Sequence, residues 1–157
     1  MDGPFERVVQ QHGATVLRVC RAVLGPVDAD DAWSETFLAA LRAWPELDQG
    51  ANVQAWLVTI AHRKAIDIVR RQQRHAVPMA ELPDRPSAPD GRDLDLWDAI
   101  AGLPHKQRHV VALHHLGGLP YEDVAAVVGG TAAAARRAGS DGIARLRQTY
   151  VTEGGDR

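Results

Sequence analysis

Residues 121–150 read YEDVAAVVGGTAAAARRAGSDGIARLRQTY and contain two helical runs, one on each side of Gly129-Gly130. The first run, Tyr121–Val128, is short, and the second extends from Ala132 to about Tyr150. A short helix, a tight turn with glycine and a second helix are the pattern of the DNA-binding helix-turn-helix. Because ordinary helical bundles also contain such hairpins, this pattern alone is only moderately specific for DNA binding.

Basic side chains on the second run make DNA binding and simple helical packing about equally supported. Beside its apolar stripe lie three arginines and a hydroxyl, Arg136, Arg137, Ser140 and Arg147. Residues 136–150 carry a net charge of +3, although the whole chain of 157 residues carries −2. A second basic segment, 62–75, carries +4, and the region 76–98 between them carries −4. The near-neutral total therefore conceals two basic segments of the kind that contact phosphates.

The acidic region contains a linker, because Pro78, Pro83, Pro86 and Pro89 interrupt a stretch with little apolar periodicity. On either side of it the apolar spacing is helical. The sequence predicts an all-α protein of two small helical domains, the second a helix-turn-helix. The expected divisions are a domain at 1–75, a flexible linker at 76–93, a domain at 94–150 and a tail at 151–157. The expected helices are 5–24, 28–44, 53–75, 94–103, 106–116, 121–128 and 132–150.

The helix expected at 53–75 has two faces. Its apolar residues fill one arc, and its basic residues share the opposite arc. Those basic residues are Arg63, Lys64, Arg70, Arg71 and Arg74. On its own, such a face is more often solvated surface than a ligand site, and Asp67 is spaced to pair with its neighbours along the helix. A second basic helix in the other half raises the support for a two-domain contact with DNA, because such a contact needs a pair of basic helices.

Several other classes of function have little support. No apolar run reaches the roughly 20 residues of a membrane span, and no secretory signal is visible, so we expect a cytoplasmic protein. Cys20 is the single cysteine, which excludes an internal disulfide or a cysteine zinc cluster. His105 and His109 have metal-compatible spacing, but the segment HKQRH lacks the glutamate of a zinc hydrolase. We therefore expect no metal, no cofactor and no catalytic residues.

Three segments resemble one known family. The pair VDADDAWSETFLAALRAWPEL and VQAWLVTIAHRKAIDIVRRQQR resembles the polymerase-binding and promoter-melting domain of bacterial extracytoplasmic-function sigma factors. The segment LWDAIAGLPHKQRHVVALHHLGGLPYEDVAAVVGG, with the helix after it, resembles that family's C-terminal promoter-binding domain. Together they cover nearly the whole chain in the right order. The resemblance implies a non-enzymatic subunit that directs core RNA polymerase to promoters and helps to open them.

The resemblance also assigns roles to residues. Its polymerase-binding face corresponds to Asp30, Asp31, Glu35 and Phe37, which would dock on the clamp coiled coil of the largest catalytic subunit. The partners it implies are core polymerase, through that clamp and the flap of the second subunit, promoter DNA, and an anti-sigma protein where one exists. Its minus-ten residues are a base-capturing loop, Leu47, Asp48, Gln49, Gly50, Ala51 and Asn52, followed by the bases Arg63, Lys64, Arg70, Arg71 and Arg74. Its minus-thirty-five residues are Thr131, Ala132, Ala133, Arg136, Arg137 and Ser140.

The last helix departs from the family pattern, which has a larger apolar residue in place of Gly139 and often a base in place of Asp141. Gly139 and Gly142 each cost about 1 kcal/mol relative to alanine inside a helix. We therefore expect a weaker minus-thirty-five contact. The main alternative is a stand-alone helix-turn-helix regulator whose N-terminal half senses a signal or dimerises. A non-DNA interaction protein and a metalloenzyme are more distant alternatives, and the promoter sequence and inducing signal lie beyond the sequence.

Overall fold

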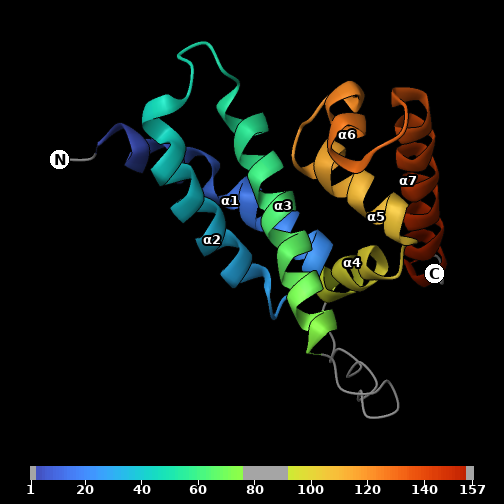
Figure 1. Ribbon diagram of the computed structural model, residues 1–157. Coiled ribbons are helices and arrows are strands. Elements are labelled where there is room, and N and C mark those ends of the chain that lie inside the picture. Colours follow the sequence, from blue (N-terminus) through green and yellow to red (C-terminus); the bar gives the residue numbers. More distant parts are fainter. Residues whose placement is uncertain (1–2, 76–91, 155–157) are drawn as a thin grey trace.

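The computed structural model describes the backbone of residues 3–75 and 92–154 and the side chains of residues 3–75 and 96–149. Within these residues all regular structure is helical, as the sequence predicts (Figure 1). The linker predicted at 76–93 and the tail predicted at 151–157 lie outside the residues whose side chains the structure describes. The division into domains at those boundaries therefore stays a prediction.

The N-terminal half consists of three long helices and one short turn. These are α1 (Pro4–Leu24), α2 (Ala29–Ala43), the 3₁₀ turn η1 (Trp44–Glu46) and α3 (Val53–Arg74). Local chemistry sets these bounds. Gly25 ends α1 at a φ of 87°, which favours glycine, and the side chain of Asn52 caps α3 by accepting a hydrogen bond from the amide of Ala55 at 3.1 Å. Each helix begins and ends within a residue or two of its predicted position.

Aromatic rings fill the outer end of this half. Phe37 packs against Phe5 at 6.4 Å and against Trp33 at 4.7 Å between ring centroids. Trp44 lies 5.7 Å from Phe5 and 6.3 Å from Trp56. The indole of Trp33 also donates a hydrogen bond of 2.9 Å to the carbonyl of Gly13 on α1. These contacts tie the three helices into one unit.

The C-terminal half contains α4 (Arg92–Ala101), α5 (His105–Val110), η3 (Val111–Leu116), α6 (Tyr121–Val128) and α7 (Ala132–Gly154). The helix predicted at 106–116 is divided, because η3 is a π-helical segment. Its wider turn ends where the amide of Gly117 donates to the carbonyl of Ala112, five residues back, at 2.9 Å. The last helix begins where predicted and extends to Gly154.

Gly139 and Gly142 allow α7 to pack closely on its neighbours. A Cβ at position 139 would lie 2.7 Å from the hydroxyl of Tyr121, and one at position 142 would lie 2.8 Å from a methyl of Val111. A real side chain in either place would require these groups to move. The two glycines thus have a packing role besides the cost in helix propensity that the sequence suggests.

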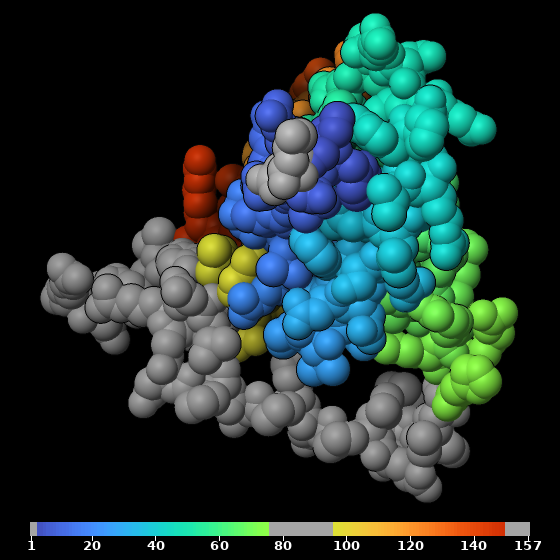
Figure 2. Space-filling model, turned by 90° about the vertical axis from the view of Figure 1, so that its left-hand side faces the viewer, coloured from blue at the N-terminus to red at the C-terminus, as the bar shows by residue number. Residues whose placement is uncertain are grey.

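The two halves are packed together through one continuous apolar cluster. Val19, Val23 and Val58 of the N-terminal half lie in the same buried cluster as Leu113 and Leu119 of the C-terminal half. Figure 1 shows α1 passing behind α3 to reach the C-terminal helices, with α2 on the far side of α3, and α1 packs directly on η3, α4 and α5. Figure 2 shows α1 and α2 side by side, with α4 next to α1. This shared core positions the candidate site.

Candidate nucleic-acid interface

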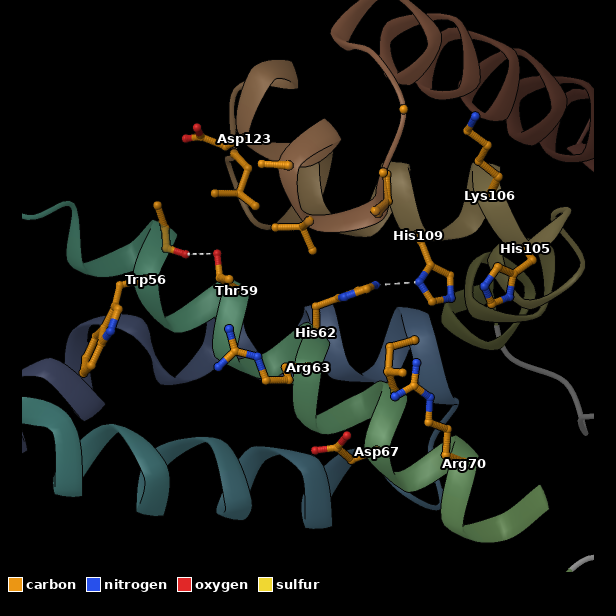
Figure 3. A pocket seen from close by; sticks show the side chains of 18 residues that line it. Trp56, Thr59, His62, Arg63, Asp67, Arg70, His105, Lys106, His109 and Asp123 are labelled. Carbon is orange, nitrogen blue, oxygen red and sulfur yellow. Dashed lines mark hydrogen bonds between the residues drawn. The ribbon is translucent and has the colours of Figure 1, made fainter. Parts of the chain in front are cut away.

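The basic residues of α3 face in two directions. Arg63 and Arg70 line a groove between α3 and the pair α5–α6, with Asp67 on the same side (Figure 3). Arg71 lies on another side of the helix, where it contacts α2, and Lys64 shares that side because it is seven residues away. Lys64 is half-buried, whereas the other four bases, including Arg74 at the end of α3, are exposed. The single basic face predicted from the sequence is therefore two surfaces.

The groove has a volume of about 1100 Å³ and draws its side chains from both halves. From α3 it receives Trp56 and Arg63, and from the C-terminal half it receives His105, Lys106 and Asp123 (Figure 3). Cationic groups outnumber the carboxylates of its lining, so it is suited to an anionic ligand. Any DNA that follows the Arg63 side of α3 meets α5 and α6 in this packed state.

The other basic surface of α3 is linked to α2. Arg71 donates to the carboxylate of Glu35 at 2.9 Å, and the side chain of Gln72 donates to Asp28 at 2.8 Å. The Arg71–Glu35 pair is the salt bridge found among the described residues, so the pairing that the sequence suggested for Asp67 is not formed there. This pair places a predicted DNA contact next to a predicted polymerase contact.

The predicted polymerase-binding residues on α2 divide between surface and core. Asp30 and Asp31 are exposed and Glu35 is half-buried. Phe37 is only 6% exposed because it lies in the aromatic cluster, so it supports the fold and is not part of the outer face. The apolar groups on that face are Leu38 and Leu41, which are 55% and 51% exposed. They lie one turn apart on α2, a spacing visible in the sequence.

The predicted base-capturing loop lies at the surface between η1 and α3. Asp48, Gln49, Gly50 and Asn52 are exposed, and Leu47 and Ala51 are half-buried. A turn in which the amide of Ala51 donates to the carbonyl of Asp48 at 3.0 Å gives the loop its shape. Because Asn52 uses its side chain to cap α3, the loop is anchored at that end.

The start of α7 presents the predicted minus-thirty-five residues. Thr131 caps the helix, since its hydroxyl accepts a hydrogen bond from the amide of Ala134 at 3.0 Å. Beyond the cap, Ala132 is half-buried, and the exposed residues are Ala133, Arg136, Arg137 and Ser140. These four exposed residues lie on one side of α7, the second helix of the helix-turn-helix.

Sequence reasoning missed a buried histidine pair between the halves. The ring of His62 on α3 and the ring of His109 on α5 share a hydrogen bond of 2.7 Å between Nε2 and Nδ1, and the two residues are 8% and 4% exposed (Figure 3). Burial is the main cause that lowers the pKa of His62 to about 4 and that of His109 to about 3. Both rings are therefore neutral near pH 7, and one donates to the other.

Two further contacts join the halves. The side chain of Gln54 donates to the carbonyl of Gly117 at 2.9 Å, and the guanidinium of Arg21 lies 4.6 Å from the ring centre of Trp97. Over residues 3–75 and 92–154, no helix is long and apolar enough to span a bilayer, and no three metal-binding side chains cluster together. Gln54 and Arg21 thus add a hydrogen bond and a cation–π contact to the apolar packing between the halves.

Comparisons with known proteins match both halves. Residues 8–75 match the family described as Sigma-70 region 2, and residues 93–146 match Sigma-70, region 4. The ECF RNA polymerase sigma factor SigD of Mycobacterium tuberculosis is 36% identical over 155 residues, covering 88% of this chain and 73% of the relative. The sigma factor ShbA of Streptomyces griseus is 34% identical over 151 residues, covering 83% and 79%. Because both regions match, one after the other along the chain, a stand-alone helix-turn-helix regulator is not favoured.

Solved structures share the same fold. The sigma factor RpoE of Bartonella quintana, solved with the anti-sigma factor NepR, is 22% identical with a TM-score of 0.75, over 98% of both chains. CnrH, solved with the cytosolic domain of CnrY, is 21% identical with a TM-score of 0.63, over 98% of this chain and 89% of that one. The helical architecture of both halves therefore has counterparts in known structures.

Proposed function

Since the chain belongs to the extracytoplasmic-function (ECF) RNA polymerase sigma factors, which direct core polymerase to promoters, we propose how its surfaces divide that work. The observation that carries the proposal is that two exposed basic helices, α3 and the start of α7, lie in separate halves. A two-part contact along one DNA molecule requires such an arrangement. Its task on promoter DNA places the protein in the bacterial cytoplasm.

The outer face of α2 is the polymerase contact. Asp30 and Asp31 supply negative charge, and Leu38 and Leu41 supply exposed apolar area beside them. A helix with both properties fits a basic, partly apolar coiled coil, here the clamp of the largest catalytic subunit. The C-terminal half engages the flap of the second large subunit. Glu35 orients Arg71 at the border between the polymerase and DNA surfaces.

The loop at 47–52 and the bases of α3 act at the minus-ten element. Extruding a base from a duplex costs a few kcal/mol, so phosphate contacts must offset part of this cost. Arg63, Lys64, Arg70, Arg71 and Arg74 are placed to supply them. Arginines suit this role because their charge attracts the phosphates of a single strand, whatever its base sequence.

The start of α7 reads the minus-thirty-five element in the major groove. Arg136 and Arg137 are exposed there, and an arginine paired with guanine contributes about 1–3 kcal/mol of discrimination. Thr131 serves as the helix cap, and Ala133 and Ser140 leave room for the DNA backbone to approach.

Promoter binding requires the two halves to separate. The two elements are about 25 base pairs apart, which corresponds to roughly 85 Å of B-form DNA. A compact chain of this length has a diameter of about 40 Å. The 16 residues from 76 to 91 extend to at most about 55–60 Å, which is enough to let the halves part. The free protein thus adopts the packed state, and core polymerase binds the state in which the two halves are separated.

Promoter opening by reconstituted holoenzyme tests the assignment of α3. The variant Arg70→Ala/Arg71→Ala should bind core polymerase but form fewer open complexes, detected by permanganate reactivity of unpaired thymines. The matched control is Arg7→Ala/Arg18→Ala, which removes two exposed charges from α1. Equal opening by both variants would refute the role of α3, and failure of the wild-type protein to bind core would refute the whole proposal.

Separation of the halves is measured by energy transfer between dyes on introduced cysteines at the exposed positions Gln11 and Ala144. Transfer should be high in the free protein and fall when core polymerase is added. Unchanged transfer would show that the packed state persists in the holoenzyme. Recovery of the tagged protein from its own cell extract tests the remaining partner, because an anti-sigma protein should be recovered in place of polymerase subunits.

A further inference from the structure

Tyr121 lies at the centre of a stack of side chains from three helical segments. On one side its ring packs flat against His114 of η3, with centroids 3.8 Å apart and planes 14° from parallel. The guanidinium carbon of Arg136 on α7 lies 5.3 Å from the centre of the same ring. Tyr121 thereby connects η3, which precedes the helix-turn-helix, to Arg136, an exposed arginine on the proposed DNA-reading surface of α7.

The backbone fixes one end of this stack. The Nδ1 of His114 lies 2.7 Å from the carbonyl oxygen of Leu119. Because a carbonyl only accepts, Nδ1 carries the proton, and this bond sets the plane of the imidazole. Leu119 is only 1% exposed, so the anchor is itself held by the core. The plane of His114 then sets the plane of Tyr121.

Gly139 provides the space for the tyrosine. It lies three residues after Arg136, on the same side of α7. A Cβ there would lie 2.7 Å from the hydroxyl oxygen of Tyr121 and 3.2 Å from its Cε1. The ring therefore occupies the space that a larger residue at 139 would fill. The departure from the family pattern at Gly139 and the stack on Arg136 are two parts of one arrangement.

We propose that Tyr121 is a positioning residue for promoter recognition, which holds Arg136 at the angle needed to read one base pair of the minus-thirty-five element. This inference rests on the proposed role of α7. An arginine side chain loses much rotamer freedom when it pairs with a base, and a partner that orders it beforehand reduces that loss. Cation–π attraction to the ring supplies this ordering before DNA arrives.

Arg137 is the matched comparison. It is exposed on the same helix and lies toward α5, beside Gln107 and away from Tyr121. Loss of the ring should therefore affect recognition by Arg136 and leave recognition by Arg137 unchanged. A general loosening of the helix-turn-helix would affect both.

The test uses holoenzyme and a pool of promoter duplexes with a randomised upstream element, sequenced after binding selection. Arg136→Ala should abolish preference at one base pair, and Tyr121→Leu should reduce preference at that same pair by roughly two- to fivefold, the ratio that an exposed cation–π contact supports. Tyr121→Phe keeps the ring and should keep the preference. Gly139→Ala should reduce it by displacing the ring, and Tyr121→Phe/Gly139→Ala should recover part of it.

A double-mutant comparison separates positioning from folding. The effect of Tyr121→Leu should disappear in the Arg136→Ala background and persist in the Arg137→Ala background. An equal effect in both backgrounds, or none in the single variant, would overturn the inference while leaving the proposed function intact. If Arg136→Ala keeps every preference, Arg136 reads no base and the inference fails. If wild-type holoenzyme selects no upstream element, the proposed role of α7 fails with it.

Discussion

The buried His62–His109 pair predicts that the packed state is lost as the pH falls. Both rings titrate near pH 6.5 in an unfolded chain, but burial lowers their pKa to about 4 and about 3 in the native protein. Below pH 6.5 the unfolded state therefore binds more protons than the native state. The free energy of unfolding of the native protein consequently decreases as the pH is lowered. The loss begins near pH 6.5 and continues until the native pKa of each ring is reached.

The magnitude follows from these values. Between pH 7 and pH 5 each histidine contributes about 2 kcal/mol of lost stability, so the pair contributes about 3–4 kcal/mol. This is a large share of the 5–15 kcal/mol typical of a small protein. Neighbouring bases add to the effect of burial, because His105 further lowers the pKa of both His62 and His109, and Arg108 further lowers that of His109.

Urea denaturation followed by circular dichroism at pH 7.5, 6.5, 5.5 and 5.0 measures this loss. The double variant His62→Leu/His109→Leu removes both titrating groups and leaves no unpaired partner, so its stability should change much less over the same range. The control His75→Gln removes an exposed histidine at the end of α3 and should behave as the wild type. Equal pH dependence in the wild type and the double variant would refute the reasoning.

Three other predictions follow from single contacts. Gly117→Ala should destabilise the protein by about 1–3 kcal/mol in urea denaturation, because its Cβ would lie 2.7 Å from a methyl of Val58 in the other half. Cys20 is fully buried with a pKa raised to about 12 by desolvation, so a thiol reagent at pH 8 should label it only at the rate of unfolding. Arg71→Ala should cost less than about 1 kcal/mol of stability in the same denaturation assay, because Arg71 and Glu35 are 51% and 36% exposed.

The helices were predictable from the sequence because local residues set their ends. Pro4 begins α1, Gly25 ends it, and Asn52 caps α3. These signals act within a few residues and do not depend on the rest of the fold. The π-helical segment η3 was not predictable in the same way, because its wider turn depends on how Gly117 packs against the other half.

The burial of single polar or aromatic residues within mixed runs was harder to predict. His62 lies in a run rich in bases, yet it continues the buried row formed by Val58 and Ala65 at helical spacing. Phe37 likewise follows Trp33 by four residues and turns inward with it. In both cases the apolar period indicated burial. The chemical type of His62 favoured the surface, and for Phe37 it was the role implied by the resemblance that did so. The stack on Tyr121 depends on three segments and has no local signal.

The shared core links stability to function. Each half alone is small for an independent domain, so packing Val19 and Val58 against Leu113 stabilises both in the free protein. The same packing keeps α3 and α7, the helices proposed to read DNA, too close together for the two promoter elements. Core polymerase can shift this equilibrium only by binding the separated halves more tightly than the packed ones. The contacts of Gln54 and His62 with the other half therefore set how much of the polymerase-binding free energy is used to separate the two halves. Weakening these contacts should raise the affinity for core polymerase and lower the stability of the free protein.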